Sequence, residues 1–132
     1  MSTEPQSANA RCHCGGVEMV ATFPSRFNAH CYCQSCRTTH AADVVTWIGF
    51  EKSQVDITRG KELITSYESS ANTWRKFCMR CGTRLAFESA RDAAWADEFH
   101  IPLALFVTPV DRVPHVNSFA DERQDWAPFH VL

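Results

Sequence analysis

Seven cysteines in three short motifs constrain the fold of this 132-residue chain more than any other feature. The motifs are CHC at 12–14, CYCQSC at 31–36 and CMRC at 78–81. A framework made only of disulfides would leave one sulfur over, and a CxC pair suits a disulfide poorly because same-face side chains of a strand lie about 7 Å apart. A zinc ion, with Zn–S distances of about 2.3 Å, can lie between two such thiolates and further ligands from elsewhere. The pattern therefore favours zinc over disulfides.

The length of the chain, its net charge and its N-terminal residues limit which partners and which cellular location we expect. A chain of 132 residues, 45% of them hydrophobic, suffices for one core. Its net charge of −2, without a long run of Lys or Arg, gives no electrostatic reason to expect nucleic acid. The polar start MSTEPQSANA lacks the apolar run of a signal peptide, and no segment reaches the roughly 18 apolar residues of a membrane span. We expect a disordered tail over 1–10, a single domain over 11–132, and a soluble, cytoplasmic protein.

Hydrophobic periodicity predicts a mostly β fold with little helix. Short runs rich in β-branched and aromatic residues, typical of strands, occur at 16–23, 43–50, 54–58, 62–69, 84–89 and 99–107. Gly and Pro residues separate many of these runs, as expected for turns between strands. The one notable helical candidate is the Ala-rich segment Ser89–Phe99, which could equally be a loop.

The spacing of the cysteines divides them into a group of four and a group of three. The CxxC pair Cys78 and Cys81, followed by Gly82, is a typical zinc hook that needs two further ligands. The CxC pair Cys12 and Cys14 can supply them and complete a closed structural site. The remaining three, Cys31, Cys33 and Cys36, form a local set with one coordination position open, which is the pattern of zinc that binds a ligand or takes part in chemistry.

A thiol is the substrate that suits a three-thiolate zinc site. Three thiolates on Zn²⁺ leave a net charge of about −1, which makes the metal a weaker Lewis acid and water activation less favourable. A coordinated thiol would lose its proton and stay electron-rich enough to attack a small carbonyl such as formaldehyde. Arg37 could offset the negative charge or bind a substrate carboxylate, or could be a solvated surface residue. His40 could approach the open position if the residues after Cys36 are helical.

The ordered motifs CHCGGV, CYCQSCR and FCMRCG, with a Trp near the C-terminus in ERQDWAPF, resemble the glutathione-dependent formaldehyde-activating enzyme (Gfa) family. The domain of this family is shared with centromere protein V, and the resemblance runs roughly from Arg11 to Phe129. It implies a tent-like arrangement of antiparallel sheets, a β-tent, with two zinc ions per chain. It assigns a structural zinc to Cys12, Cys14, Cys78 and Cys81 and a catalytic zinc to Cys31, Cys33 and Cys36.

The function that the resemblance implies is a carbon–sulfur lyase activity like that of S-(hydroxymethyl)glutathione synthase. Its partners would be a small thiol such as glutathione and a small aldehyde. The sequence departs from the family pattern near the proposed reaction site, where Ala41 replaces a common Gly and LALFVTPVD replaces the usual Gly-x-Leu-Asp stretch. The alternative is a binding module in which both metals only hold loops, and a fourth protein ligand such as His40 would favour it. A metal-free redox sensor at CYCQSC would leave the other four cysteines unexplained.

Overall fold

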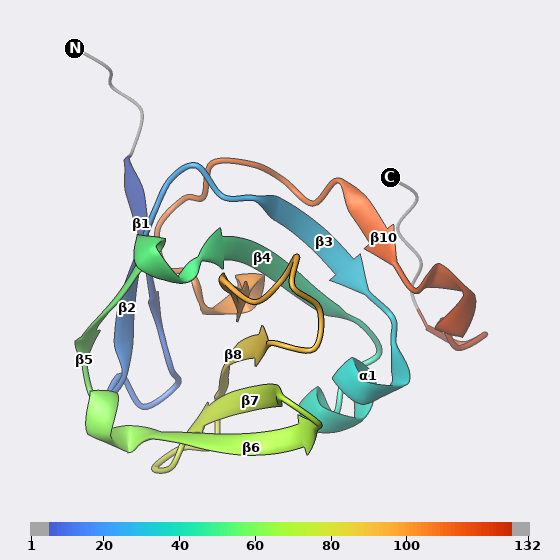
Figure 1. The fold of residues 1–132 in the computed structure, drawn as a ribbon, viewed down its shortest axis with the longest axis horizontal. Coiled ribbons are helices and arrows are strands. Elements are labelled where there is room, and N and C mark those ends of the chain that lie inside the picture. Colours follow the sequence, from blue (N-terminus) through green and yellow to red (C-terminus); the bar gives the residue numbers. More distant parts are fainter. Residues whose placement is uncertain (1–5, 128–132) are drawn as a thin grey trace.

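The computed structural model describes residues 6–127. β-Strands are the main regular secondary structure of the described chain, as Figure 1 shows. The strands are β1 (Ser7–Arg11), β2 (Glu18–Thr22), β3 (Phe27–Cys31), β4 (Val45–Glu51), β5 (Val55–Arg59), β6 (Ile64–Ser70), β7 (Thr73–Cys78), β8 (Arg84–Ser89), β9 (Glu98–Pro102) and β10 (Val116–Ser118). The helices are α1 (Gln34–His40) and the single 3-10 turns η1 (Lys52–Gln54), η2 (Lys61–Leu63), η3 (Leu103–Leu105) and η4 (Ala120–Glu122).

The strands form two sheets. The smaller sheet has the order β1-β2-β5, and the larger has the order β10-β3-β4-β9-β8-β7-β6. All neighbouring strands are antiparallel except β10, which runs parallel to β3 at one edge. In Figure 1 the large sheet curves, so that β3 and β10 lie in the upper part of the view and β6 and β7 in the lower part. The prediction of a mostly β fold with antiparallel sheets and little helix is confirmed.

The structure corrects one local prediction and decides between the alternatives of another. The expected disordered tail over 1–10 is wrong for residues 7–10, which belong to β1, because Ala8 and Ala10 are buried and β1 pairs with β2. Residues 1–5 of that tail lie outside the described residues. The candidate helix Ser89–Phe99 is a loop of turns over 90–97, since β8 ends at Ser89 and β9 already begins at Glu98. Within residues 6–127, no helix is long and apolar enough to cross a membrane.

Side chains alternate between the two faces of the large sheet and so create two separate environments. Ile48 and Phe50 of β4, like Phe99 and Ile101 of β9, pack in the main core beneath the smaller sheet, where Met19 of β2 meets them. The intervening residues of the same strands face the concave side. The sheet therefore carries an apolar core on one face and leaves its other face free to build a site.

The absence of a side chain at Gly49 leaves room for one aromatic ring on the concave face. A Cβ atom at this position would collide with the ring of Phe27, which lies on the paired strand β3 directly opposite. The ring of Phe27 instead lies flat across the glycine and meets the imidazole of His100 edge-on, with ring centroids 4.7 Å apart. The absence of a side chain at Gly49 thus fixes how the rings of the concave face pack.

We predict that Gly49→Ala lowers the free energy of unfolding by about 1–3 kcal/mol, because the added methyl group forces Phe27 out of its place. Urea denaturation of the wild type and the variant measures the loss. The double variant Gly49→Ala/Phe27→Ala is the control, and in it the extra cost of the alanine at position 49 is expected to disappear. Equal costs of Gly49→Ala with and without Phe27 would contradict this explanation.

Candidate functional site

The first cysteine group joins two distant parts of the chain at the core face of the large sheet. Cys12 and Cys14 lie in the turn after β1, while Cys78 ends β7 and Cys81 lies in the following turn. The four Sγ atoms all lie within 4.8 Å of one another, with 3.5 Å between Cys12 and Cys14 and 3.9 Å between Cys14 and Cys78. A tetrahedral zinc site with Zn–S distances of about 2.3 Å requires sulfur separations of about 3.8 Å. The group could therefore bind a metal ion, and its geometry fits zinc.

Backbone amides and a hydroxyl group stabilise negative charge on these sulfurs. The CHC motif is a turn and not an extended segment, because the amide of Gly15 donates to the carbonyl oxygen of Cys12 at 3.0 Å. The turn aims the amide of Gly16 at Cys14 Sγ, at 3.4 Å, and that of Val17 at Cys12 Sγ, at 3.3 Å. A hydrogen bond with the Thr83 hydroxyl lowers the pKa of the Cys81 thiol to about 5. Metal ions bind cysteine in its thiolate form, and hydrogen bonds of this kind stabilise that form.

The second cysteine group is local and lies at the concave face. Cys31 ends β3, Cys33 is the N-cap of α1, and Cys36 lies in the first turn of that helix. Their Sγ atoms lie within 4.8 Å of one another, with 3.6 Å between Cys31 and Cys36. Cys33 Sγ accepts a hydrogen bond from the Cys36 amide at 3.3 Å. The contact that caps the N-terminus of the helix therefore also holds Cys33 and Cys36 close together. This group could also bind a metal ion.

Among residues 6–127, no histidine or carboxylate completes the second group. The segment after Cys36 is helical, but the ring of His40 lies edge-on to Trp47, with centroids 5.1 Å apart. Burial lowers the pKa of His40 to about 4, and the positive charges of Arg75 and Arg84 act in the same direction. The His40 side chain thus packs as a neutral ring and is not part of the sulfur cluster.

Arg75, on β7, supplies the positive charge that the sequence suggested for Arg37. Both terminal nitrogens of Arg75 lie 3.8 Å from Cys36 Sγ, and the side chain is only 5% exposed. Its guanidinium also stacks over Phe87, 5.0 Å from the ring centroid. Hydrogen bonds from the other two thiols, together with Arg75, lower the pKa of the Cys36 thiol. Arg37 instead donates through Nε to the carbonyl oxygen of Tyr32 at 3.0 Å.

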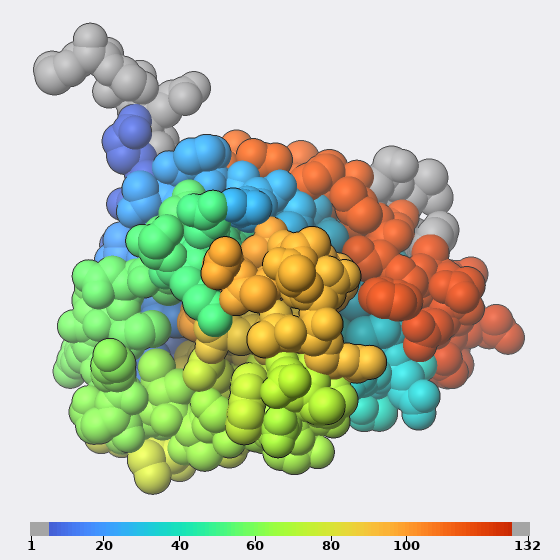
Figure 2. All heavy atoms as spheres, in the orientation of Figure 1, coloured from blue at the N-terminus to red at the C-terminus, as the bar shows by residue number. Residues whose placement is uncertain are grey.

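A cavity of about 720 Å³ opens from the three-cysteine group over the concave face. Strands β3, β4 and β6–β10 all contribute to its walls, which include the rings of Trp47, Phe87, Trp95 and Phe119. The loop over 90–97 passes across the middle of this side of the molecule, between β4 above and β7 below, and is the orange cluster at the centre of Figure 2. Arg37 is not among the described residues that line the cavity. The cavity is within the size range of small-molecule sites.

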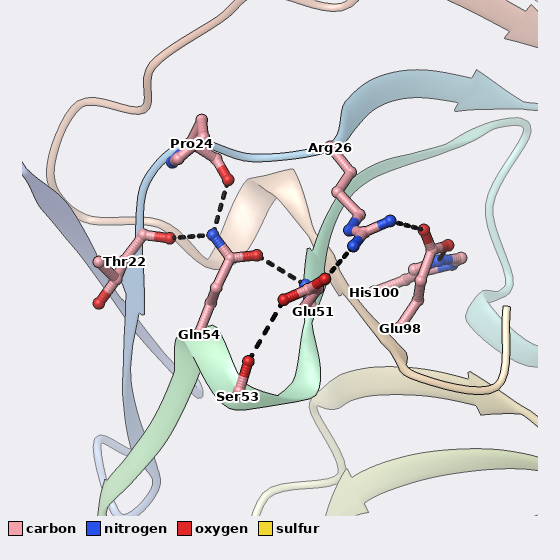
Figure 3. Close-up of polar contacts among 8 residues, drawn as sticks. All are labelled: Thr22, Pro24, Arg26, Glu51, Ser53, Gln54, Glu98 and His100. Carbon is pink, nitrogen blue, oxygen red and sulfur yellow. Dashed lines mark hydrogen bonds and ion pairs between the residues drawn. The ribbon is translucent and has the colours of Figure 1, made fainter.

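Glu98 and His100 form a hydrogen-bonded pair in the cavity wall. Nε2 of His100 lies 3.0 Å from Oε1 of Glu98, and Arg26 reaches both Glu98 and Glu51 from the outside, as Figure 3 shows. Burial lowers the pKa of His100, and the neighbouring carboxylate of Glu98 opposes the shift only in part. Sequence reasoning gave His100 no role. Side chains alternate along a strand, and Phe99 and Ile101 on either side of His100 face the core. This alternation could have indicated that His100 faces the opposite side.

Comparisons with known proteins agree with this description. The family model described as "Glutathione-dependent formaldehyde-activating enzyme" matches residues 7–122. A crystal structure of a Rhodobacter sphaeroides protein superposes with a TM-score of 0.64 at 22% sequence identity. The alignment covers 80% of this chain and 97% of that one, and the likeness supports the fold. A comparison with curated protein sequences gives no match.

We predict that Arg75→Met weakens zinc binding at the three-cysteine group by roughly tenfold to a hundredfold, the usual cost of removing a partner of a metal ligand. The reason is that the thiolate of Cys36 loses its buried counter-charge. Competition with a chromophoric chelator measures the affinity of each site. Arg91→Met is the matched control because Arg91 also lines the cavity but its guanidinium lies 3.5 Å from Ser70 Oγ instead of beside the sulfurs. An equal loss in both variants, or a loss at the four-cysteine group, would contradict the assignment.

We also predict that the pKa of the His100 imidazole lies below its ordinary value and that Glu98→Gln lowers this pKa further. Burial disfavours the charged ring, and the carboxylate that partly compensates is removed in the variant. Two-dimensional NMR of the histidine ring signals across a pH series gives both values. A pKa of His100 that rises in Glu98→Gln would show that the carboxylate does not stabilise the protonated ring.

Proposed function

The chain belongs to the glutathione-dependent formaldehyde-activating enzyme family, and from that premise we propose that it is a zinc-dependent enzyme that joins a thiol to a small aldehyde. The reaction class is that of a carbon–sulfur lyase, and the product is a hemithioacetal such as S-(hydroxymethyl)glutathione. The observation that carries the proposal is that the three-cysteine group, without a fourth ligand among the described residues, adjoins the large cavity. A substrate sulfur can reach the metal position from that cavity.

The charges around the three-cysteine group support a thiol as the ligand. Three thiolates and Zn²⁺ sum to −1, and the buried guanidinium of Arg75 brings the immediate surroundings to zero. A zinc ion held there would provide an open coordination position and lower the pKa of a thiol that occupies it. Arg75 keeps the electron-rich sulfurs from repelling the incoming thiolate, so this residue would favour binding of the substrate in its reactive form.

In the proposed reaction, one S–C bond forms and no oxidant or reductant is needed. The thiol gives up its proton, the sulfur attacks the aldehyde carbon, and the carbonyl oxygen becomes a hydroxyl group by taking up one proton. The rings of Trp47 and Phe87, with centroids 5.9 Å apart, give the cavity an apolar wall beside the sulfurs. A binding module would close the second site with a protein ligand, and His40, the obvious candidate, packs against Trp47 instead.

We predict that the zinc-loaded protein accelerates the exchange between free formaldehyde and S-(hydroxymethyl)glutathione. Exchange NMR with ¹³C-formaldehyde and glutathione measures the rate without any coupled reaction. The variant Cys33→Ser should reduce the rate to that of buffer, because the second site loses one of its three ligands. Two-zinc protein that binds glutathione but leaves the exchange rate unchanged would favour the binding module.

A second prediction separates the two cysteine groups. Cys81→Ser should give an unfolded or insoluble chain, because its zinc ties together segments 64 residues apart and the free energy of binding is largely folding free energy. Cys33→Ser should stay folded, since the metal there closes only a short loop and a serine still caps α1. Thermal melts and metal counts of both variants test the division, and equal destabilisation would contradict it.

A further inference from the structure

The cavity lining includes the three-cysteine group near one end of β4 and the pair of Glu98 and His100 nearer the other end of that strand. Along β4, Cys31 pairs with Val45, whereas His100 pairs with Gly49. Four residues of strand separate the two positions, a distance of roughly 13 Å. The rings of Trp47 and Phe87 line the wall between them. A ligand that fills the cavity can therefore make polar contacts at both ends.

His100 presents a hydrogen-bond acceptor at its end of the cavity. The carboxylate of Glu98 can only accept, so Nε2 of His100 carries the hydrogen of their 3.0 Å hydrogen bond. In a neutral ring, Nδ1 is then the acceptor, and burial favours the neutral ring. No described residue donates a hydrogen bond to Nδ1. The free acceptor is available to a ligand in the cavity.

The surroundings of His100 favour a cationic donor. Arg26 contacts both Glu51 and Glu98, so this cluster keeps a net charge of −1, while Arg91 and Asp92 on the cavity wall add one charge of each sign. The rings of Phe27, Phe87 and Trp95 all lie within 6.3 Å of the His100 ring, centroid to centroid. Carboxylates and aromatic rings together are the groups that bind ammonium ions.

We propose that the cavity binds an elongated thiol at two points, with the sulfur at the three-cysteine group and a protonated amino group donating to Nδ1 of His100. This inference rests on the proposed function and names the residues that recognise the substrate at the same site. The sulfur and the amino nitrogen of glutathione are eight bonds apart, roughly 10 Å in an extended conformation, so such a thiol is long enough once protein side chains reach in from both ends. A two-carbon thiol reaches only the sulfur end. His100 and Glu98 therefore select the length and charge of the substrate.

Calorimetry on the zinc-loaded full chain tests this proposal with three probes, glutathione, N-acetylglutathione and 2-mercaptoethanol. His100→Phe keeps a ring among its aromatic neighbours but removes the acceptor, and Glu98→Gln removes only the charge. Glu88→Gln is the matched control, because Glu88 lies on the neighbouring strand β8, pairs with Lys52 and Lys76, and does not line the cavity. The amino group that N-acetylation removes is the one proposed to contact His100.

We expect His100→Phe to weaken glutathione binding by roughly tenfold to a hundredfold, the range of a hydrogen bond to a charged group. N-acetylation should weaken binding to the wild type similarly and have no further effect in His100→Phe. Glu98→Gln should also weaken glutathione binding, whereas Glu88→Gln should not, and 2-mercaptoethanol should bind all four proteins equally.

Two results would overturn the proposal while leaving the proposed function intact. The first is an unchanged affinity for glutathione in both His100→Phe and Glu98→Gln. The second is an equal loss for 2-mercaptoethanol in these variants, which would show that they disturb the sulfur end. If the wild type with two zinc ions binds none of the three thiols, the proposed function fails together with this inference.

Discussion

Side-chain alternation across the seven-stranded sheet separates the two cysteine groups, and the rest of the structure depends on this separation. One face packs Ile48 and Ile101 against the smaller sheet, and Cys12 and Cys78 belong to that core. The other face carries Cys31 and Cys36 beside the cavity. A metal at the core face would stabilise the fold, while one at the cavity face can meet a ligand. The same strands thus supply stability and a site without competing for the same surface.

Charge balance within a largely apolar cavity explains why the concave face combines sulfur, arginine and aromatic rings. Burying three thiolates costs free energy unless cations compensate them. A metal ion bound there would supply most of the compensation and Arg75 the remainder, since its guanidinium is buried against Cys36 and stacked on Phe87. At the far end, Arg26 performs a similar role for Glu98. Each of these buried charges therefore has a partner of opposite charge. A ligand that enters the cavity meets polar groups whose positions are already fixed.

Features that depend on residue spacing and hydrophobic periodicity could be predicted from the sequence. Features that depend on contacts between residues far apart in the chain could not. The cysteine partition and the runs at 43–50 and 99–107 were readable because sulfur spacing and β-branched residues are local signals. Strand β7 was not predicted, because Arg75 interrupts the apolar pattern and its partners, the sulfur of Cys36, the ring of Phe87 and two hydroxyl groups, are brought to it by the fold. Helix α1 was missed because its N-cap is a cysteine instead of a usual capping residue. Arg37 was considered because it follows Cys36 in sequence, but adjacency in sequence does not say where a side chain points, and Arg75 lies 39 residues away from Cys36.

The central claim is that one metal site is closed and the other is open to a thiol. Replacing zinc by ¹¹³Cd and recording the cadmium NMR spectrum tests it directly, because each ion reports its own ligands. The account predicts two signals of equal intensity, of which only one shifts when glutathione is added. A single signal, or two signals of which neither shifts when glutathione is added, would contradict it.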